Sequence, residues 1–236
     1  MRKLRFIHSL IEYLRGSVLC ALIASLSACA DGSCDHTNSG LGVNGSMGET
    51  PTIKGNISRW GNMSGYTLEA RLQPPDILLS TAPISASGEF SVTLPGGDIV
   101  NSMIAETDYS QYQNLFGDNC SGCIYTSLQH YRYSRIVFVA KKGDSVYSIG
   151  YGLSGPPAPP YRVVNFVYTD RAVSNNGTII CHQADRTLRW DKDYKFESGW
   201  NSVLTIADGN AVEPNNLSYT TPPPPDVLWL SSQYAF

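Results

Sequence analysis

Four cysteines lie in the body of this 236-residue chain, and their spacing permits more than one chemistry. Cys120 and Cys123 form a Cys-Ser-Gly-Cys motif, Cys34 lies far before it, and Cys181 follows it. An even number of cysteines in an exported chain favours structural disulfides, and four cysteines allow three pairings. A redox-active dithiol at Cys120 and Cys123 is the alternative. Such a site needs the first cysteine at a helix N-terminus, and Gly122 disfavours a helix there. We therefore expect structural disulfides.

A zinc site is a further alternative for the same residues. Cysteine and histidine are zinc ligands, and the candidates are Cys120, Cys123, His130, Cys181 and His182. Only one closely spaced cysteine pair is present, whereas closed zinc sites usually contain a second pair. Cys181 and His182 are adjacent, so on a strand they would point to opposite faces. We expect neither a metal nor a cofactor.

Other residue types suited to catalysis form no recognisable constellation. Three histidines lie beyond residue 28, namely His36, His130 and His182, and none is close to a Gly-x-Ser-x-Gly nucleophile motif. Asp191 and Asp193 would share one face of a strand. That face alternates with Lys192 and Tyr194 along the chain, so we expect it to be solvated and not catalytic. The sequence predicts no catalytic residue.

Aromatic residues are the best indication of binding. A largely polar segment contains five tyrosines that we single out as ligand-contact candidates: Tyr109, Tyr112, Tyr125, Tyr131 and Tyr133. Flat amphipathic rings on a loop suit the faces of sugars or a protein partner. The alternative is that about half of these rings pack beneath the loop.

The N-terminal residues that would position the chain in the cell have the character of a signal peptide. Four basic residues precede or flank an apolar stretch at 17–28, which is too short to span a membrane. Leu26-Ser-Ala-Cys29 resembles the lipobox of bacterial lipoproteins. The resemblance implies that Cys29 receives fatty acyl chains such as palmitate and anchors the protein in the cell envelope. Ala30 after the cysteine implies the outer membrane or cell surface. Residues 28–30 also suit conventional cleavage, which would give a secreted protein.

The charge of the chain excludes one class of partner. Without residues 1–28, which contain four basic residues and one acidic residue, the formal net charge falls from −3 to −6. The remaining Lys and Arg residues are scattered, so phosphate backbones and anionic lipid head groups should be repelled. We expect no nucleic-acid partner, and we expect the membrane to be reached through the acyl chains alone.

The pattern beyond the signal peptide indicates strands. Residues 29–50 are rich in Gly, Ser and Asn and predict a flexible tether. Apolar and polar residues alternate at 66–72 and 89–94. Further strand candidates lie at 53–59, 77–82, 134–140, 145–151, 162–169, 190–196 and 200–206. Ser198-Gly199 should join the last two as a two-residue hairpin.

These elements predict an all-β protein. We expect an antiparallel β-sandwich of roughly ten strands over residues 51–236, with a sub-boundary near residue 107 as an alternative. Little helix is expected after the signal peptide, beyond a turn at 109–116.

Two segments of the sequence resemble segments of known bacterial proteins. In Ala82-Pro-Ile-Ser-Ala-Ser-Gly-Glu-Phe-Ser-Val-Thr-Leu94, a turn ending at Gly88 leads into an alternating strand. The segment 53–94 thereby resembles the transthyretin-like or carboxypeptidase-regulatory-like β-sandwich modules of bacterial envelope proteins, which implies scaffolding or adhesion. Tyr168-Thr-Asp-Arg-Ala-Val173 with Gly199-Trp-Asn201 is similar to a pattern in uncharacterised exported bacterial lipoproteins, which implies no particular activity.

The sequence therefore predicts a lipid-anchored envelope protein with a non-catalytic binding or scaffolding role and a protein or glycan partner. Two alternatives remain open. One is an extracytoplasmic thiol-disulfide protein that uses Cys120 and Cys123. The other is a carbohydrate-binding module that uses the tyrosines of residues 109–133.

Overall fold

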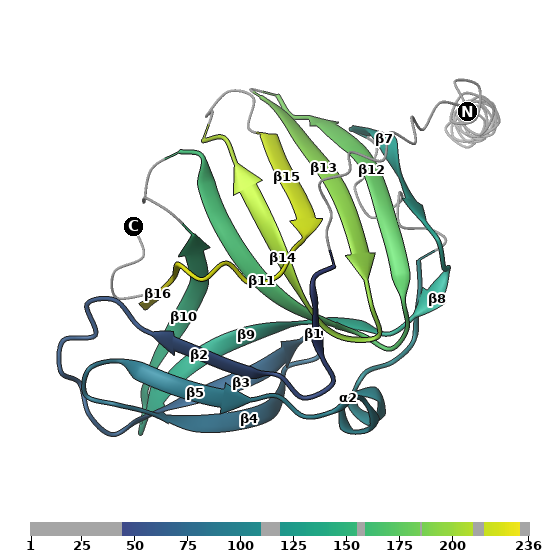
Figure 1. Cartoon of the computed structure of the whole chain (residues 1–236). Helices are drawn as coiled ribbons and strands as arrows, with labels where there is room; N and C mark the ends of the chain where they lie inside the picture. The colour runs from purple at the N-terminus through teal and green to yellow at the C-terminus, as the bar shows by residue number, and fades with distance from the viewer. Residues whose placement is uncertain (1–43, 110–118, 155–158, 185, 210–214, 232–236) are drawn as a thin grey trace, which may run out of the picture. The chain divides into compact units, whose positions relative to one another are not determined.

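A computed structural model describes residues 44–109, 119–154, 159–184, 186–209 and 215–231, with the side chains of 151–154 left aside (Figure 1). The all-β prediction is confirmed, although the described residues form sixteen strands and not roughly ten. The strands of the first part are β1 Ser46–Gly48, β2 Thr52–Asn56, β3 Tyr66–Gln73, β4 Ile77–Ile84, β5 Glu89–Thr93 and β6 Thr107–Asp108. The following strands are β7 Cys120–Thr126, β8 His130–Tyr131, β9 Tyr133–Lys142, β10 Ser145–Ser154, β11 Tyr161–Thr169, β12 Val173–His182, β13 Thr187–Phe196, β14 Gly199–Ala207, β15 Asn215–Thr220 and β16 Val227–Ser231.

Twelve of these strands form one sheet. Its main path runs β4-β3-β9-β10-β11-β14-β15-β13-β12-β7, while β1 pairs with β14 and β16 pairs with β10 (Figure 1). Strands β2 and β5 form a second sheet, and β6 and β8 a third. The alternation that predicted β3 is reflected in its burial, since Tyr66, Leu68, Ala70 and Leu72 are all buried.

One pairing in the large sheet is parallel, which corrects the expectation of a strictly antiparallel sandwich. β13 pairs in parallel with β15, and β15 pairs antiparallel with β14. The predicted hairpin between the strands at 190–196 and 200–206 is therefore wrong. Although Ser198 separates β13 from β14 by a short turn, β15 lies between them in the sheet. A turn depends on a few adjacent residues, whereas the order of the strands in the sheet depends on contacts between residues far apart in the chain.

The sheet divides at one place. Strand β9 pairs with β11 at residues 133–135 and with β10 at residues 138–142. Strand β10 also pairs with β11, through Gly152 and Leu153, on the same edge that faces β9. Three strands therefore enclose a triangular opening, which we call the fork. Its sides are residues 136–137 of β9, 150–151 of β10 and 165–166 of β11, which have no cross-strand partner on these edges within the described sheet.

The main core joins the two halves of the chain. It contains Trp60 and Leu68 from the first part and Phe138, Trp200 and Trp229 from the second. Strand β3 pairs along its length with β9, so the described residues on both sides of residue 107 share one sheet. The sub-boundary near residue 107 is therefore not a break between separate sheets.

Two local elements differ from the sequence-based expectation. Gly97–Met103 forms helix α2, which is too short for its periodicity to stand out in the sequence. Its first turn carries Asp98, a favourable charge there, and Val100 is buried. The end of the expected tether forms β1, so the folded part begins before residue 51. No described helix is long and apolar enough to cross a membrane.

Candidate functional site

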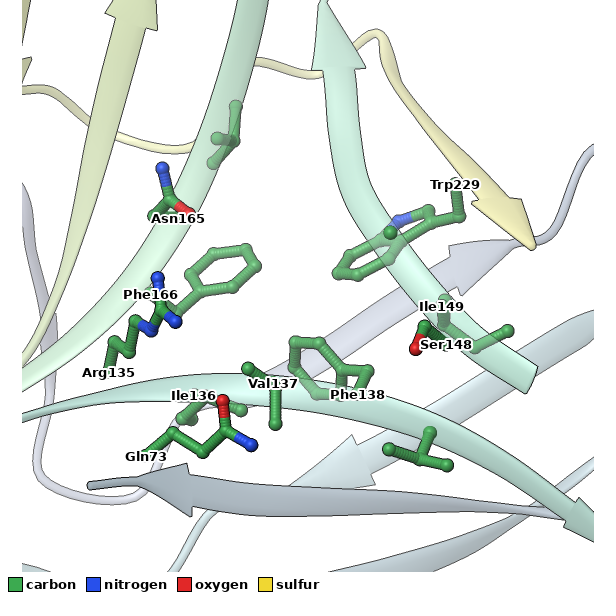
Figure 2. Close-up of a pocket in the computed structure, with 13 residues that line it drawn as sticks. Gln73, Arg135, Ile136, Val137, Phe138, Ser148, Ile149, Asn165, Phe166 and Trp229 are labelled. Carbon is green, nitrogen blue, oxygen red and sulfur yellow. The ribbon is translucent and has the colours of Figure 1, made fainter. Parts of the chain in front are cut away.

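The fork opens into a pocket, which we call the fork pocket, with a volume of about 220 Å³ (Figure 2). Side chains of successive strand residues point to opposite faces of a sheet. Ile136, Phe138 and Phe166 belong to the buried face, whereas Arg135 and Asn165 belong to the other. The pocket therefore passes from a polar mouth to an apolar floor.

Three aromatic rings from three strands form the floor. The ring of Phe138 on β9 lies nearly perpendicular to both Phe166 on β11, at 84°, and Trp229 on β16, at 88°. Phe166 and Trp229 are close to parallel, with an angle of 14° and 6.0 Å between centroids. Edge-to-face and offset arrangements of this kind hold aromatic side chains in fixed positions. The floor of the pocket is therefore formed by aromatic rings whose positions are fixed by their contacts with one another.

Trp229 is positioned by two independent contacts. Strand β16 pairs with the far edge of β10, and the Ser58 N–H donates to the Trp229 carbonyl at 2.7 Å. The indole lies against Gly55 of β2 so closely that any Cβ at this position would collide with it. Gly55 is therefore required to let the Trp229 ring lie beside the pocket.

The mouth carries the polar groups of the pocket. Gln73 and Arg135 are cross-strand partners, and Asn165 lies on the adjacent strand. Figure 2 shows these three side chains on the same side of the opening, across from Trp229 and Ile149. Among the described residues that line the pocket, Arg135 is the one with a charge, and none is acidic. Within the described part of the chain the Arg135 guanidinium has no ion pair and no hydrogen bond.

Four other arginines of the described residues differ in this respect, whereas Arg59 and Arg162 also form no ion pair there. Arg71, Arg132, Arg171 and Arg189 each form an ion pair with a carboxylate. The hydrogen bond from Arg189 to Asp191 raises the pKa of Arg189, and the negative charge of Asp191 raises it further. An arginine without such a partner keeps its hydrogen-bond donors available for an anion.

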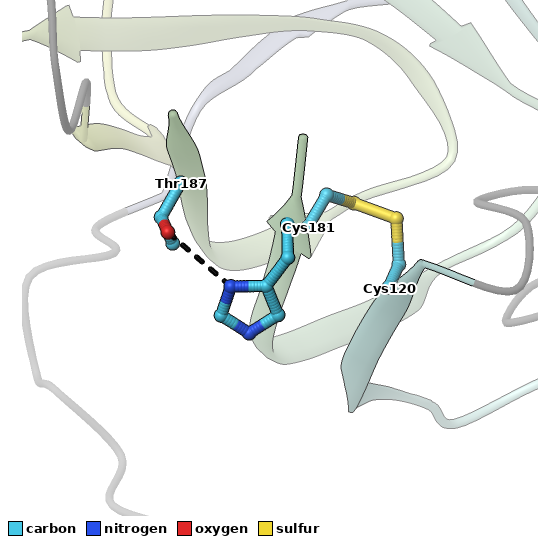
Figure 3. The surroundings of a disulfide bond; sticks show 4 residues. Cys120, Cys181 and Thr187 are labelled. Carbon is cyan, nitrogen blue, oxygen red and sulfur yellow. Dashed lines mark hydrogen bonds between the residues drawn. A yellow bond between two sulfur atoms is a disulfide. The ribbon is translucent and has the colours of Figure 1, made fainter. Parts of the chain in front are cut away.

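The described cysteines lie on β12 and β7, at one end of the strand path. Cys120 on β7 and Cys181 on β12 are direct cross-strand partners and are joined by a disulfide (Figure 3). The neighbouring His182 ring lies 3.2 Å from the Thr187 hydroxyl, Nδ1 to Oγ1, on the other face of β12. The bridge therefore ties an edge strand to the sheet.

The predicted redox motif is placed in a strand. Cys120 and Cys123 both belong to β7, not to a helix N-terminus, and the bond of Cys120 is made to Cys181. Cys123 is disulfide-bonded as well, to a partner that is not among the described residues. Cys34 and the lipidation candidate Cys29 lie outside the described residues. The geometry adds no support to a thiol-disulfide enzyme.

The residues considered as zinc ligands do not surround a common site. Cys120 and Cys181 are used in the disulfide, and His182 faces away from Cys181 because the two are adjacent on β12. No cluster of three metal-ligating side chains occurs in the described ranges.

The tyrosines do not form one exposed surface. Tyr131 is 2% exposed and stacks on Tyr109 with 4.2 Å between ring centroids. Tyr133 packs near Phe196, and Tyr125 is 51% exposed. Tyr112 lies outside the described residues. The glycan-binding role of this group stays a prediction.

The paired carboxylates on β13 are also used structurally. Asp193 is 5% exposed, so the predicted solvated face is wrong at this residue. Asp191 accepts hydrogen bonds from the Thr178 hydroxyl at 2.6 Å and from Arg189. Burial would raise the pKa of Asp191, but these hydrogen bonds outweigh it and lower the pKa.

A second hollow lies beside α2 and carries acidic residues. Glu49 accepts a hydrogen bond from the Gly97 N–H at 3.2 Å, and the Tyr168 hydroxyl donates to Asn101 Oδ1 at 3.1 Å. Burial raises the pKa of Tyr168, and the charges of Glu49 and Asp170 raise it further. The phenol therefore serves as a protonated hydrogen-bond donor here.

Comparison with protein-family models, with curated protein sequences and with solved structures found no match to this chain. The class of protein must therefore be inferred from its own features. The residues of the fork pocket were missed by sequence analysis, because Arg135, Phe138 and Phe166 lie in ordinary β-rich runs of the sequence. The opening arises from the pairing of the strands and leaves no local signal.

Proposed function

We propose that this chain is an exported, lipid-anchored binding protein of the cell envelope, and that its binding site is the fork pocket. The observation that supports binding is the pocket itself, in which core aromatic rings are reached through a mouth that carries Arg135 and two amides. Pockets that combine apolar walls with a few polar groups are typical of small-molecule sites.

Two features support the extracytoplasmic location. The Leu26-Ser-Ala-Cys29 phrase resembles a lipobox, with Cys29 as the acylated residue. Disulfides persist in oxidising compartments, so the bond between Cys120 and Cys181 suits an exported protein. Conventional secretion is the alternative fate, and the same binding role would then be exercised in solution.

The anchor is tested by metabolic labelling with an alkyne-bearing palmitate, followed by intact mass analysis of the protein from the envelope fraction. We expect label on the wild-type chain and an N-terminus at acylated Cys29. Cys29→Ala should abolish the label and release the protein from the membrane fraction. Cys20→Ala, which changes a cysteine inside the signal peptide, is the matched control and should leave labelling unchanged. An unlabelled protein that begins at Asp31 would show that it is secreted.

A further inference from the structure

We propose that the fork pocket binds a small carboxylate whose body is a single flat aromatic ring. This inference rests on the binding function proposed above and adds the chemical class of the ligand. Three properties of the pocket support it: its size, its aromatic floor and the unpaired cation at its mouth.

The size of the pocket limits the ligand. Its volume of about 220 Å³ lies below the range of about 300–1,000 Å³ that holds drug-sized molecules. It exceeds the roughly 150 Å³ of an apolar cavity that takes up benzene. A ligand of one ring with a short polar substituent fits between these limits.

The floor selects a flat ring. Phe138, Phe166 and Trp229 come from separate strands and are fixed by mutual ring contacts, with centroids 5.3 Å apart for Phe138 and Trp229 (Figure 2). The three residues are only 5%, 4% and 3% exposed, so an aromatic ligand would contact the parts of these rings that border the pocket, and ring faces and edges are the surfaces that aromatic groups prefer to contact. A flexible aliphatic chain would lose more conformational entropy in the same space.

The mouth selects a negative charge. Arg135 is exposed to solvent, lies on the same face as its cross-strand partner Gln73, and has no carboxylate partner in the described chain. A guanidinium can bind both oxygens of one carboxylate. The side-chain amides of Gln73 and Asn165 supply further donors at the same mouth. None of the described lining residues is acidic, so none of them repels the charge of the ligand.

The strand edges at the fork add a further source of polar groups. Among the described strands, residues 136–137, 150–151 and 165–166 have no cross-strand partner on the sides that face the opening. Backbone N–H and C=O groups on such edges require partners, which a bound ligand or water can supply. On either side of the opening the same edges are paired, β9 with β10 at 138–142, β9 with β11 at 133–135 and β10 with β11 at 152–153.

The test is a binding titration on the purified full-length chain. Phenylacetate is the probe, phenylacetamide the neutral analogue and acetate the anion without a ring. Binding is followed by tryptophan fluorescence and by backbone amide chemical shifts. We expect phenylacetate to shift the amides of Val137, Gly150 and Phe166, and to bind about tenfold more tightly than phenylacetamide. Acetate should shift none of them.

Arg135→Gln is the decisive variant, and Arg162→Gln is its matched control. Arg162 is also exposed on the sheet but does not line the pocket. We expect Arg135→Gln to weaken phenylacetate binding about tenfold or more, to leave phenylacetamide binding unchanged, and to keep the thermal unfolding midpoint of the wild-type chain. Arg162→Gln should bind phenylacetate as the wild-type chain does.

The outcomes separate this inference from the proposed function. If phenylacetamide binds the wild-type chain at the fork as tightly as phenylacetate, or if Arg135→Gln binds phenylacetate as tightly as the wild-type chain does, the ligand is not a carboxylate held by Arg135 and only this inference fails. If neither ring compound shifts the fork residues, nor benzoate or 3-phenylpropanoate in the same assay, both the inference and the binding function at this pocket fail.

Discussion

Asp170 lies directly after β11, and its carboxylate accepts hydrogen bonds from both Arg132 and Arg171. Its Oδ1 accepts the Arg132 N–H at 2.8 Å, and its Oδ2 accepts Arg171 Nη2 at 2.9 Å. Arg132 also donates from Nε to the Ile104 carbonyl, beyond α2. One buried side chain therefore ties the start of β9 to the end of β11 and to the segment after the helix.

The pKa of Asp170 predicts acid sensitivity. Burial works to raise this pKa, but the hydrogen bonds from the Arg132 backbone and from Arg171 outweigh it, so the pKa is lowered. A carboxyl with a lowered folded-state pKa stabilises the fold fully above its unfolded pKa of about 3.9. This contribution is lost as the pH falls through the folded-state pKa, that is, below about pH 4.

We therefore expect Asp170→Asn to reduce the free energy of unfolding at pH 7 by about 2 kcal/mol, since buried donors lose a charged acceptor. The variant should also lose less stability than the wild-type chain between about pH 4 and pH 2. Urea unfolding at several pH values measures both effects. Asp144→Asn, in the exposed turn between β9 and β10, is the control and should behave as the wild-type chain. Identical acid dependence in the wild type and in Asp170→Asn would contradict the assignment.

Strand β7 is the edge strand that the disulfide between Cys120 and Cys181 ties to the sheet. It is the last strand of the path and pairs with β12 on one edge. Gly122 and Gly177 have φ values of +97° and +143°, and a Cβ at either would collide with a carbonyl of the opposite strand. The two glycines therefore let the backbones of β7 and β12 approach each other closely. The disulfide joins the first residue of β7 to β12.

Removing this disulfide should loosen β7 before the rest of the sheet. The bond closes a loop with a sequence separation of 61, for which loop-closure entropy predicts about 4 kcal/mol of stabilisation. Cys120→Ser with Cys181→Ser should lose about this amount in urea unfolding. Hydrogen exchange should become faster in β7 while β3 and β9 keep their protection. Substitution is preferable to reduction because Cys123 is also disulfide-bonded. Unchanged protection of β7 would show that the bridge does not hold the edge strand.

In the folded chain as a whole, the parts before and after residue 107 depend on each other. β3 is covered on one edge by β4 and on the other by β9. Leu68, Ala70 and Leu72 are fully buried in a core that also contains Phe138 and Trp229. A fragment without β9 would expose these side chains to water.

We therefore expect one cooperative unfolding transition for the full chain, with coincident midpoints by far-UV circular dichroism and tryptophan fluorescence. A fragment of residues 44–107 expressed alone should give the circular dichroism of an unfolded chain. Two separated transitions in the full chain, or a fragment that melts cooperatively, would show that residue 107 marks a domain boundary.

The sequence by itself predicted the secondary structure class and most individual strands. Alternation of apolar and polar residues is local, because successive side chains of a strand face opposite ways. It therefore revealed β3 and β5, whereas β9 to β11 were predicted from β-rich runs that are apolar on both faces. Helix α2 was missed because seven residues give too short a pattern.

The candidate site is a feature of the tertiary structure that local sequence patterns do not reveal. The fork exists because β9 and β11 pair at one end and both pair with β10 at the other, and Trp229 reaches it from the last described strand. Likewise, β15 separates β13 from β14, and Cys181 was one of three possible partners for Cys120. Strand neighbours and register are set by contacts between residues far apart in the chain, so these features emerge only when the whole sheet packs against its core.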